Sequence, residues 1–237
     1  MRNLIKMPEV FELLTKLTGL TLNVKLPVEL DETRLLSDFQ NVYETFQGTQ
    51  HSVSHHHDGG WTAIGLVTSG GDVYEDRSIR KVGKPYIPTP ALELCPYIKE
   101  LLDNLPCEKH RVRFMALAPG TKIKWHYDGK DSIDYGRVGR FHIPIITNPN
   151  IEFKICSNVC QWVAGNLYYG DFSFPHTVKS NWDKVRVHLV LDLTPNQAIV
   201  DLFPESFIQE RFKRKILRKL CRQIYTMREA HLLGSMP

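Results

Sequence analysis

Hydrophobic and polar residues alternate along this chain with two different periods, helical in its first hundred residues and strand-like after them. Apolar residues three to four apart predict a helix over 7–18, and Asp31 is the expected N-cap of a second helix over 34–46. A third helix is predicted over 92–105. Its true start is expected at about Cys95, because Pro96 suits the first turn of a helix. Between these helices the pattern predicts strands over 20–26 and 61–68 and loops over 47–60 and 76–90.

From Arg111 onwards, short runs rich in β-branched and aromatic residues follow one another, separated by Gly, Pro, Asn or Asp. Such runs with regular turn signals predict an antiparallel barrel or sandwich. We therefore expect one domain over 1–203, with N-terminal helices and a β core at about 111–194. A basic amphipathic helix is expected over 204–237. Its predicted apolar face consists of Phe207, Phe212, Ile216, Leu220 and Ile224.

The composition is that of an ordinary globular protein, with 42% hydrophobic and 24% charged residues among 237. The net charge of +4 is too small to indicate a nucleic-acid partner by itself. Five cysteines without a framework spacing indicate a reducing compartment. The sequence has no apolar run that suits a signal peptide or a membrane span. We expect a soluble cytoplasmic protein that binds neither nucleic acid nor membrane.

A His-x-Asp pair, His126 and Asp128, precedes a distant histidine, His176. On a strand, side chains two residues apart point to the same face, so this pair can bind adjacent positions of one metal. Two histidines and one carboxylate leave three positions open, an arrangement typical of non-haem Fe(II) oxygenases. A packed core histidine is the alternative for either imidazole taken alone.

Two further polar pairs lie on apolar strands. Arg186 stands ten residues after His176 within the strand predicted over 185–193. An interior guanidinium is unfavourable without an anion, and a dicarboxylate cosubstrate would supply one. Arg140 and His142 share one face of a strand over 139–146, although a solvated strand edge would also explain Arg140.

Other conspicuous features allow less specific chemistry. The loop containing His55, His56, His57 and Asp58 is expected to be exposed, with a lid over an active site as the alternative. Cys156 and Cys160 lack a second ligand pair for zinc. Arg113 is expected to form a salt bridge, although it could hold a substrate carboxylate. For the basic tail we expect packing on the barrel with solvated charges. Contact with a second copy in a homodimer, or with a negatively charged carrier protein, is the alternative role for this tail.

Several segments together resemble the aspartyl/asparaginyl β-hydroxylase family of Fe(II)/2-oxoglutarate-dependent oxygenases, in particular the bacterial branch that includes free-proline cis-hydroxylases. The resemblance covers about 59–195 and rests on the segments GWTAIGLVTSGG, LELCPYIKELLDNLP, RVRFMALAPGTKIKWHYDG, GRFHIPIITNP, GDFSFPHTV and VRVHLVLDL. It implies a mainly β protein with flanking helices, whose core is a double-stranded β-helix (jelly-roll, cupin-like) barrel.

The resemblance also implies cofactors and residue roles. Fe(II), 2-oxoglutarate and O2 are expected, with His126, Asp128 and His176 as iron ligands. Arg186 would bind the distal carboxylate of 2-oxoglutarate, and Arg140 and His142 would contact the same cosubstrate. One branch of the family has glycine at the carboxylate position, whereas this sequence has the full triad.

The expected function is hydroxylation of an unactivated C–H bond of a small amino-acid-like substrate, with succinate and CO2 as coproducts. The amino acid could be free, peptide-bound or carrier-bound. Three alternatives remain at this point: desaturation or cyclisation of a small natural product with the same cofactors, a non-catalytic β-barrel binding module, and a cupin-type metalloenzyme that does not use 2-oxoglutarate.

Overall fold

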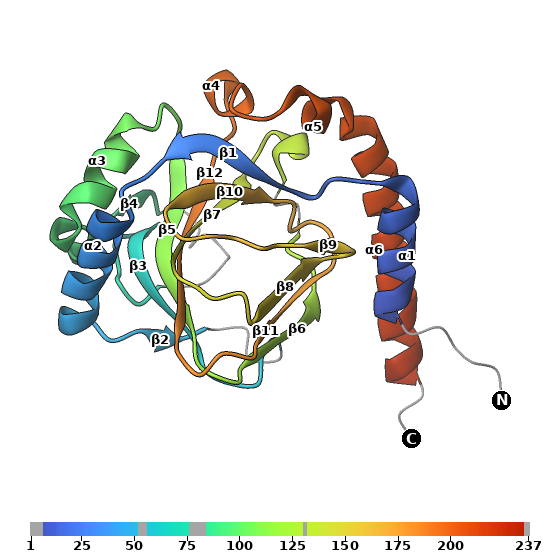
Figure 1. Ribbon diagram of the computed structural model, residues 1–237, viewed down its shortest axis with the longest axis horizontal. Coiled ribbons are helices and arrows are strands. Elements are labelled where there is room, and N and C mark those ends of the chain that lie inside the picture. Colours follow the sequence, from blue (N-terminus) through green and yellow to red (C-terminus); the bar gives the residue numbers. More distant parts are fainter. Residues whose placement is uncertain (1–6, 52–55, 76–83, 130–131, 235–237) are drawn as a thin grey trace.

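The computed structural model in Figure 1 describes residues 7–51, 56–75, 84–129 and 132–234. The α-helices are α1 (Met7–Thr18), α2 (Glu32–Thr45), α3 (Pro96–Asn104), α4 (Gln197–Val200), α5 (Glu205–Gln209) and α6 (Arg211–Gly234), with 3-10 turns η2 (Pro90–Leu94) and η3 (Ile133–Tyr135). The strands are β1 (Asn23–Glu29), β2 (Thr49–Gln50), β3 (Trp61–Ser69), β4 (Tyr86–Pro88), β5 (Lys109–Leu117), β6 (Lys122–His126), β7 (Gly139–Ile146), β8 (Ile151–Ile155), β9 (Asn158–Val159), β10 (Asn166–Gly170), β11 (His176–Ser180) and β12 (Arg186–Leu193).

The strands form two antiparallel sheets. The larger sheet has the order β1-β10-β7-β12-β5-β3-β2, with β4 paired to β3, and the smaller one has the order β6-β11-β8-β9. One pocket is lined from both sheets, so the two sheets face each other. No strand pairing within the described chain closes them into a complete barrel. The fold is therefore the expected jelly-roll with flanking helices, built as two facing sheets.

Alternation along the strands of the large sheet separates two environments. On β12, Val187, Leu189 and Leu191 point into a core shared with α2, α3 and η2. Arg186 and His188 point the other way and line pockets. Because side chains on a strand alternate between faces, the same eight residues fill an apolar core and furnish a polar interior.

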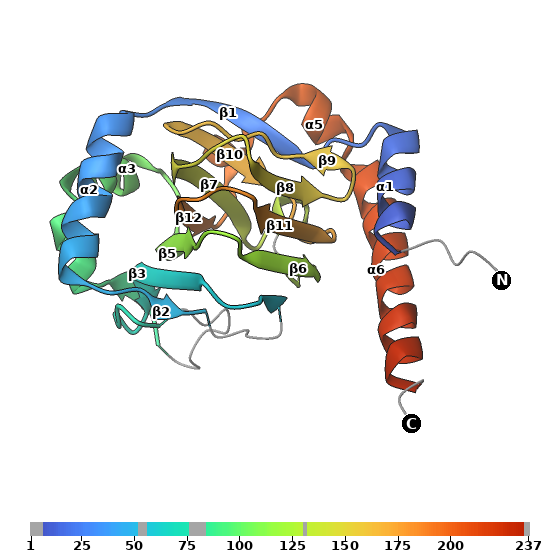
Figure 2. The ribbon, with the colours of Figure 1, turned by 60° about the horizontal axis from the view of Figure 1, so that its bottom comes forward.

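A second core lies against the small sheet. It joins Phe153 of β8 and Phe172 to Phe11 of α1 and Leu217 of α6. Figures 1 and 2 show the consequence: α2 and α3 cover one side of the sheets, while α1 and α6 run side by side along the opposite side. The pocket thus lies between two helical flanks.

Most predicted elements are confirmed, with shifted ends. The second helix begins where expected, since an Asp31 side-chain oxygen accepts a hydrogen bond from the Arg34 backbone N–H at 3.0 Å. The first predicted strand, over 20–26, lies instead at Asn23–Glu29. Leu20 and Leu22 lie in the connection between α1 and β1, and both pack in the second core. Their hydrophobic spacing was interpreted as a strand, but they are buried in this connection.

The prediction for the basic tail is wrong about which face is buried. Phe207 is buried, but Phe212 and Ile216 are 72% and 54% exposed. In their place α6 buries Arg214 and Arg218, which pair with carboxylates of the segments after β6 and β10. A cation enters a protein interior when an acid there neutralises it, and the tail sequence alone does not show those acids.

The predicted loops, the cysteines and the absence of a membrane span can also be compared with the structure. The predicted loop over 47–60 contains β2, and the one over 76–90 contains β4; residues 52–55 and 76–83 lie outside the described residues. All five cysteines are free, although the cytoplasmic location stays a prediction. Across the described residues, no helix has the length and apolar character that crossing a membrane requires.

Candidate active site

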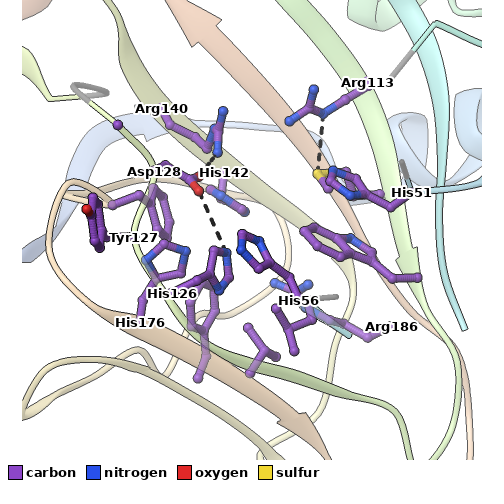
Figure 3. Close-up of a pocket in the computed structure, with 17 residues that line it drawn as sticks. His51, His56, Arg113, His126, Tyr127, Asp128, Arg140, His142, His176 and Arg186 are labelled. Carbon is purple, nitrogen blue, oxygen red and sulfur yellow. Dashed lines mark hydrogen bonds and ion pairs between the residues drawn. The ribbon is translucent and has the colours of Figure 1, made fainter. Parts of the chain in front are cut away.

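The two histidines of the predicted metal site face each other across a strand pair. His126 ends β6 and His176 begins β11, and the two are directly paired in the antiparallel register. Asp128 lies two residues beyond the end of β6, not on the strand as predicted, and its backbone N–H donates to Phe172 O at 2.8 Å. One potential ligand atom from each of the three residues lies within 4.8 Å of the others. Figure 3 shows the His126, Asp128 and His176 side chains gathered at one side of the cavity.

Backbone carbonyls orient both imidazoles. His126 Nδ1 lies 2.7 Å from Lys124 O and His176 Nδ1 lies 3.0 Å from Phe174 O. With Nδ1 donating to a carbonyl, Nε2 is the unprotonated nitrogen, which is the form a metal binds. Burial, followed by the nearby His126, lowers the pKa of His176 to about 3, so its ring is neutral at physiological pH.

Asp128 is held as a carboxylate. Burial by itself would raise its pKa, but Arg140 and the two histidines outweigh burial and hold the pKa below its usual range. Arg140 Nη1 bonds directly to Asp128 Oδ2. Two imidazoles with their Nε2 atoms toward one carboxylate are the donor set that suits Fe(II), so the residues fit the metal that the sequence pattern predicts.

A buried charge network on the large sheet supports this carboxylate. Asp192 on β12 stands between Arg140 on β7 and Arg111 on β5 in the strand register. It accepts from Arg140 Nε at 2.7 Å and from Arg111 Nη2 at 2.6 Å. Arg140 is therefore no solvated strand edge. Sequence reasoning passed over Asp192, although an aspartate on the same strand face as Arg186 and His188 was a usable signal.

Arg186 has no acid partner among the described residues. It is 4% exposed, and its Nε and Nη2 lie 3.0 and 2.8 Å from the ring nitrogens of His188. Burial lowers its pKa to about 9. His142 Nδ1 lies 3.2 Å from His188 Nδ1, while His142 Nε2 is buried with no hydrogen-bond partner. A buried cation and an unsatisfied ring nitrogen together fit a carboxylate ligand.

The three proposed metal ligands, Arg140, His142 and Arg186 line a cavity of about 420 Å³ between the sheets, together with Arg113 and aromatic residues. His51 stacks on Trp61 with ring centroids 3.7 Å apart. His56 lies over His126 at 4.4 Å between centroids and lines the cavity, and His57 is buried. The expectation of an exposed loop is therefore wrong for these two histidines, of which His56 lies in the cavity wall, and right for Asp58, which is exposed; His55 lies outside the described residues.

Two other expected features have simple outcomes. Arg113 lines the cavity, is almost fully buried, and donates through Nε to Met115 Sδ at 3.4 Å. Burial lowers its pKa to about 9, with Arg111 adding to the effect. Cys156 and Cys160 join no metal-ligand cluster: within the described residues, His126, Asp128 and His176 form the one such group.

Two facing antiparallel sheets with a His-Asp-His cluster in the cavity between them define the jelly-roll class of non-haem iron oxygenases. The aspartyl/asparaginyl β-hydroxylase family model matches residues 29–195, and the chain belongs to this family. It is accordingly a dioxygenase of the hydroxylase type, and membership implies Fe(II), 2-oxoglutarate and O2.

Solved structures agree with this fold. A 2OG-Fe(II) oxygenase family oxidoreductase from Burkholderia pseudomallei is 13% identical, with a TM-score of 0.50, and the match covers 81% of this chain and 92% of that one. A prolyl hydroxylase from Trichoplax adhaerens, in complex with a hypoxia inducible factor peptide fragment, is also 13% identical, with a TM-score of 0.50 and 84% and 94% coverage. At this identity the likeness concerns the fold alone.

Proposed function

We propose that this enzyme hydroxylates an unactivated C–H bond of an amino acid, free, peptide-bound or carrier-bound, with succinate and CO2 as coproducts. The observation that carries the proposal is the composition of the cavity. A His-Asp-His cluster shares it with three buried arginines: Arg140 already pairs with Asp128 and Asp192, and the other two are Arg113 and Arg186. One arginine suits the carboxylate of a cosubstrate and the other suits the carboxylate of an amino-acid substrate.

Three residues would hold iron in this proposal: His126, Asp128 and His176. When bound, iron and 2-oxoglutarate supply the oxidising power to insert one oxygen atom of O2 into a C–H bond. The chain fixes the ligands in advance, because carbonyl groups orient both imidazoles and Arg140 keeps the Asp128 carboxylate ionised. Little reorganisation is then needed when the metal binds.

For 2-oxoglutarate, Arg186 would bind the distal carboxylate. The guanidinium is buried and without an acid partner among the described residues, so a carboxylate would relieve the unfavourable burial of its charge. His142 Nε2 offers one further polar contact in the same cavity. Arg140 bonds to Asp128 and Asp192, and we propose that it contacts 2-oxoglutarate from this fixed position.

The substrate would lie between the metal cluster and the wall formed by His51, Trp61 and Arg113. Arg113 would take the carboxylate of the amino acid, while the stacked His51 and Trp61 rings exclude water from one side. The family description, aspartyl/asparaginyl β-hydroxylase, supports an amino acid as the group that is oxidised.

A partner contact on α6 belongs to the same proposal. Phe212, Ile216 and Leu220 are exposed and spaced four residues apart, so they share one face of the helix. Lys215 and Lys219 are exposed on the same helix. Apolar residues beside lysines suit a negatively charged carrier protein better than a second copy, since an antiparallel pair of these helices would bring like charges together.

The test is anaerobic titration of the Fe(II)-loaded enzyme with 2-oxoglutarate, followed through the visible charge-transfer band of the chelate. The band should appear in the wild type and vanish in His176→Ala. Aerobic incubation with free amino acids and short peptides should then yield succinate together with a product heavier by one oxygen atom. A folded wild-type protein that gives no band and binds no 2-oxoglutarate by calorimetry would contradict the proposal.

A further inference from the structure

The helix α6 lies beyond the residues that the family model matches, yet it contacts the segments that carry all three proposed metal ligands. Tyr225 Oη donates to the carbonyl oxygen of Trp125, the residue before His126, at 3.3 Å. Arg218 Nη2 lies 3.1 Å from Ser132 Oγ, four residues after Asp128. The family match alone gives no reason for this arrangement.

Arg218 also contacts the segment that leads to His176. Its Nη2 donates to Asp171 Oδ2 at 2.7 Å, and both side chains are almost fully buried. Asp171 accepts in addition from Ser132 Oγ at 3.0 Å and from the backbone N–H of Ser173 at 3.2 Å. A buried carboxylate needs such a cation, so the position of Asp171 depends on Arg218.

The segment that follows Asp171 holds two of the metal ligands through backbone carbonyls. Phe172 O accepts the Asp128 N–H at 2.8 Å, and Phe174 O lies 3.0 Å from His176 Nδ1. Both carbonyls come within three residues of Asp171. A shift of this segment would therefore move the Asp128 backbone and release the orientation of the His176 ring.

We propose that Arg218 is a positioning residue for the metal site, acting through Asp171 and Ser132 on the backbone that holds Asp128 and His176. This inference rests on the metal site of the proposed function and extends it to a helix outside the family match. The competing explanation is that Arg218 merely anchors α6, in which case its loss would lower stability but leave metal binding unchanged.

The chain supplies a matched control one helical turn earlier. Arg214 is as deeply buried as Arg218 and pairs with Asp134 through two contacts of 2.9 Å. Arg218 shares the Asp134 partner at 2.7 Å. Within the described residues, Arg214 forms no hydrogen bond or ion pair with Asp171 or Ser132. Replacement of either arginine removes a buried ion pair from α6, but only the Arg218 replacement should disturb the ligand-bearing segment.

The experiment is anaerobic titration of the full-length apoprotein with Co(II), read from the visible d–d band, together with a thermal melt of each variant. Loss of a group bonded directly to a ligand typically weakens metal affinity about 10- to 100-fold, and because Arg218 acts one contact further away we expect Arg218→Met to weaken Co(II) affinity by about the lower of these factors and to alter the band. Arg214→Met should bind Co(II) like the wild type despite a lower melting temperature. In Arg218→Met/Asp171→Asn, where no unpaired charge remains, the Co(II) affinity should still be weakened.

Should Arg218→Met fail to fold, Arg218→Lys keeps the charge but loses the planar guanidinium, and a weaker Co(II) affinity in that variant supports the proposal. The proposal is overturned if the folded Arg218 variants bind Co(II) like the wild type, or if Arg214→Met loses as much affinity. A folded wild-type protein that binds no Co(II) contradicts the metal site itself and, with it, this positioning role.

Discussion

Arg186→Met is the sharpest test of the cosubstrate site, because the structure gives opposite signs for its effects on folding and on binding. Burial lowers the pKa of Arg186 from 12.5 to about 9, which corresponds to about 5 kcal/mol of unfavourable environment for the charged form. The guanidinium stays protonated in the folded protein below about pH 9, so this unfavourable term is present at neutral pH. Methionine is of comparable length and carries no charge. Without 2-oxoglutarate, the variant should be at least as stable as the wild type.

Binding of 2-oxoglutarate should change in the other direction. Removing one partner of a buried ion pair costs about 3–5 kcal/mol, which is roughly two to four orders of magnitude in the dissociation constant. The 2-oxoglutarate Kd should rise by that factor, whereas the Fe(II) affinity should change little because Arg186 touches none of the three proposed ligands.

The assay is calorimetric titration of the anaerobic Fe(II) protein, paired with urea unfolding of the apoprotein. A 2-oxo acid without the distal carboxylate, such as 2-oxobutanoate, is the control ligand, and it should bind wild type and variant equally. The reasoning is refuted if Arg186→Met binds 2-oxoglutarate like the wild type, or if it loses affinity for both oxo acids alike.

Three other perturbations test separate parts of the structure. Asp128→Gly should abolish succinate formation and weaken Co(II) binding, because it removes the carboxylate ligand; retained turnover would mean that two histidines suffice. Burial lowers the pKa of His51 from 6.5 to about 3, so stability should be lost as pH falls through this window, by up to about 3 kcal/mol at about pH 4.5. In urea unfolding compared at about pH 7 and about pH 4.5, His51→Phe should lose less stability on acidification than the wild type by that amount. An unchanged pH dependence of the unfolding free energy would contradict the assignment. Ile216→Asp should raise the KM for a carrier-bound amino acid and leave turnover of the free amino acid unchanged; sedimentation of the wild type alone as a dimer that Ile216→Asp dissociates would instead favour self-association.

Local periodicity explains why the main elements of the fold were predictable from the sequence. The run from Arg186 to Leu193 alternates between polar and apolar residues except at Val190, and its odd positions enter the apolar core as expected. That His126 and His176 belong to one metal site was predicted from residue types and spacing, whereas the register that pairs them joins two distant strands and was not predicted. Element ends were less predictable: Leu20 and Leu22 are buried by α1 and α6 packing, not by a strand.

Partners of buried charges could not be predicted in the same way. Asp192 meets Arg111 and Arg140 because β12 lies between β5 and β7, an order that no local pattern encodes. Likewise, Arg218 of α6 is buried because it pairs with Asp171. The amphipathic pattern of the helix alone predicted that this arginine would be solvated. Each of these choices depends on residues dozens of positions away.

The sequence by itself therefore determined the class of fold and the family, and it predicted a set of residues for iron and a dicarboxylate. Those features depend on spacing along one strand or on motifs within one segment, and both are properties of a contiguous chain. Only the tertiary structure decided which cations pair with acids, that Arg186 has no acid partner among the described residues, and how α6 reaches the segments with the proposed metal ligands. The physical reason is that the energy of a buried charge depends on the groups around it in space, and strand order and helix packing bring those groups together from distant parts of the chain.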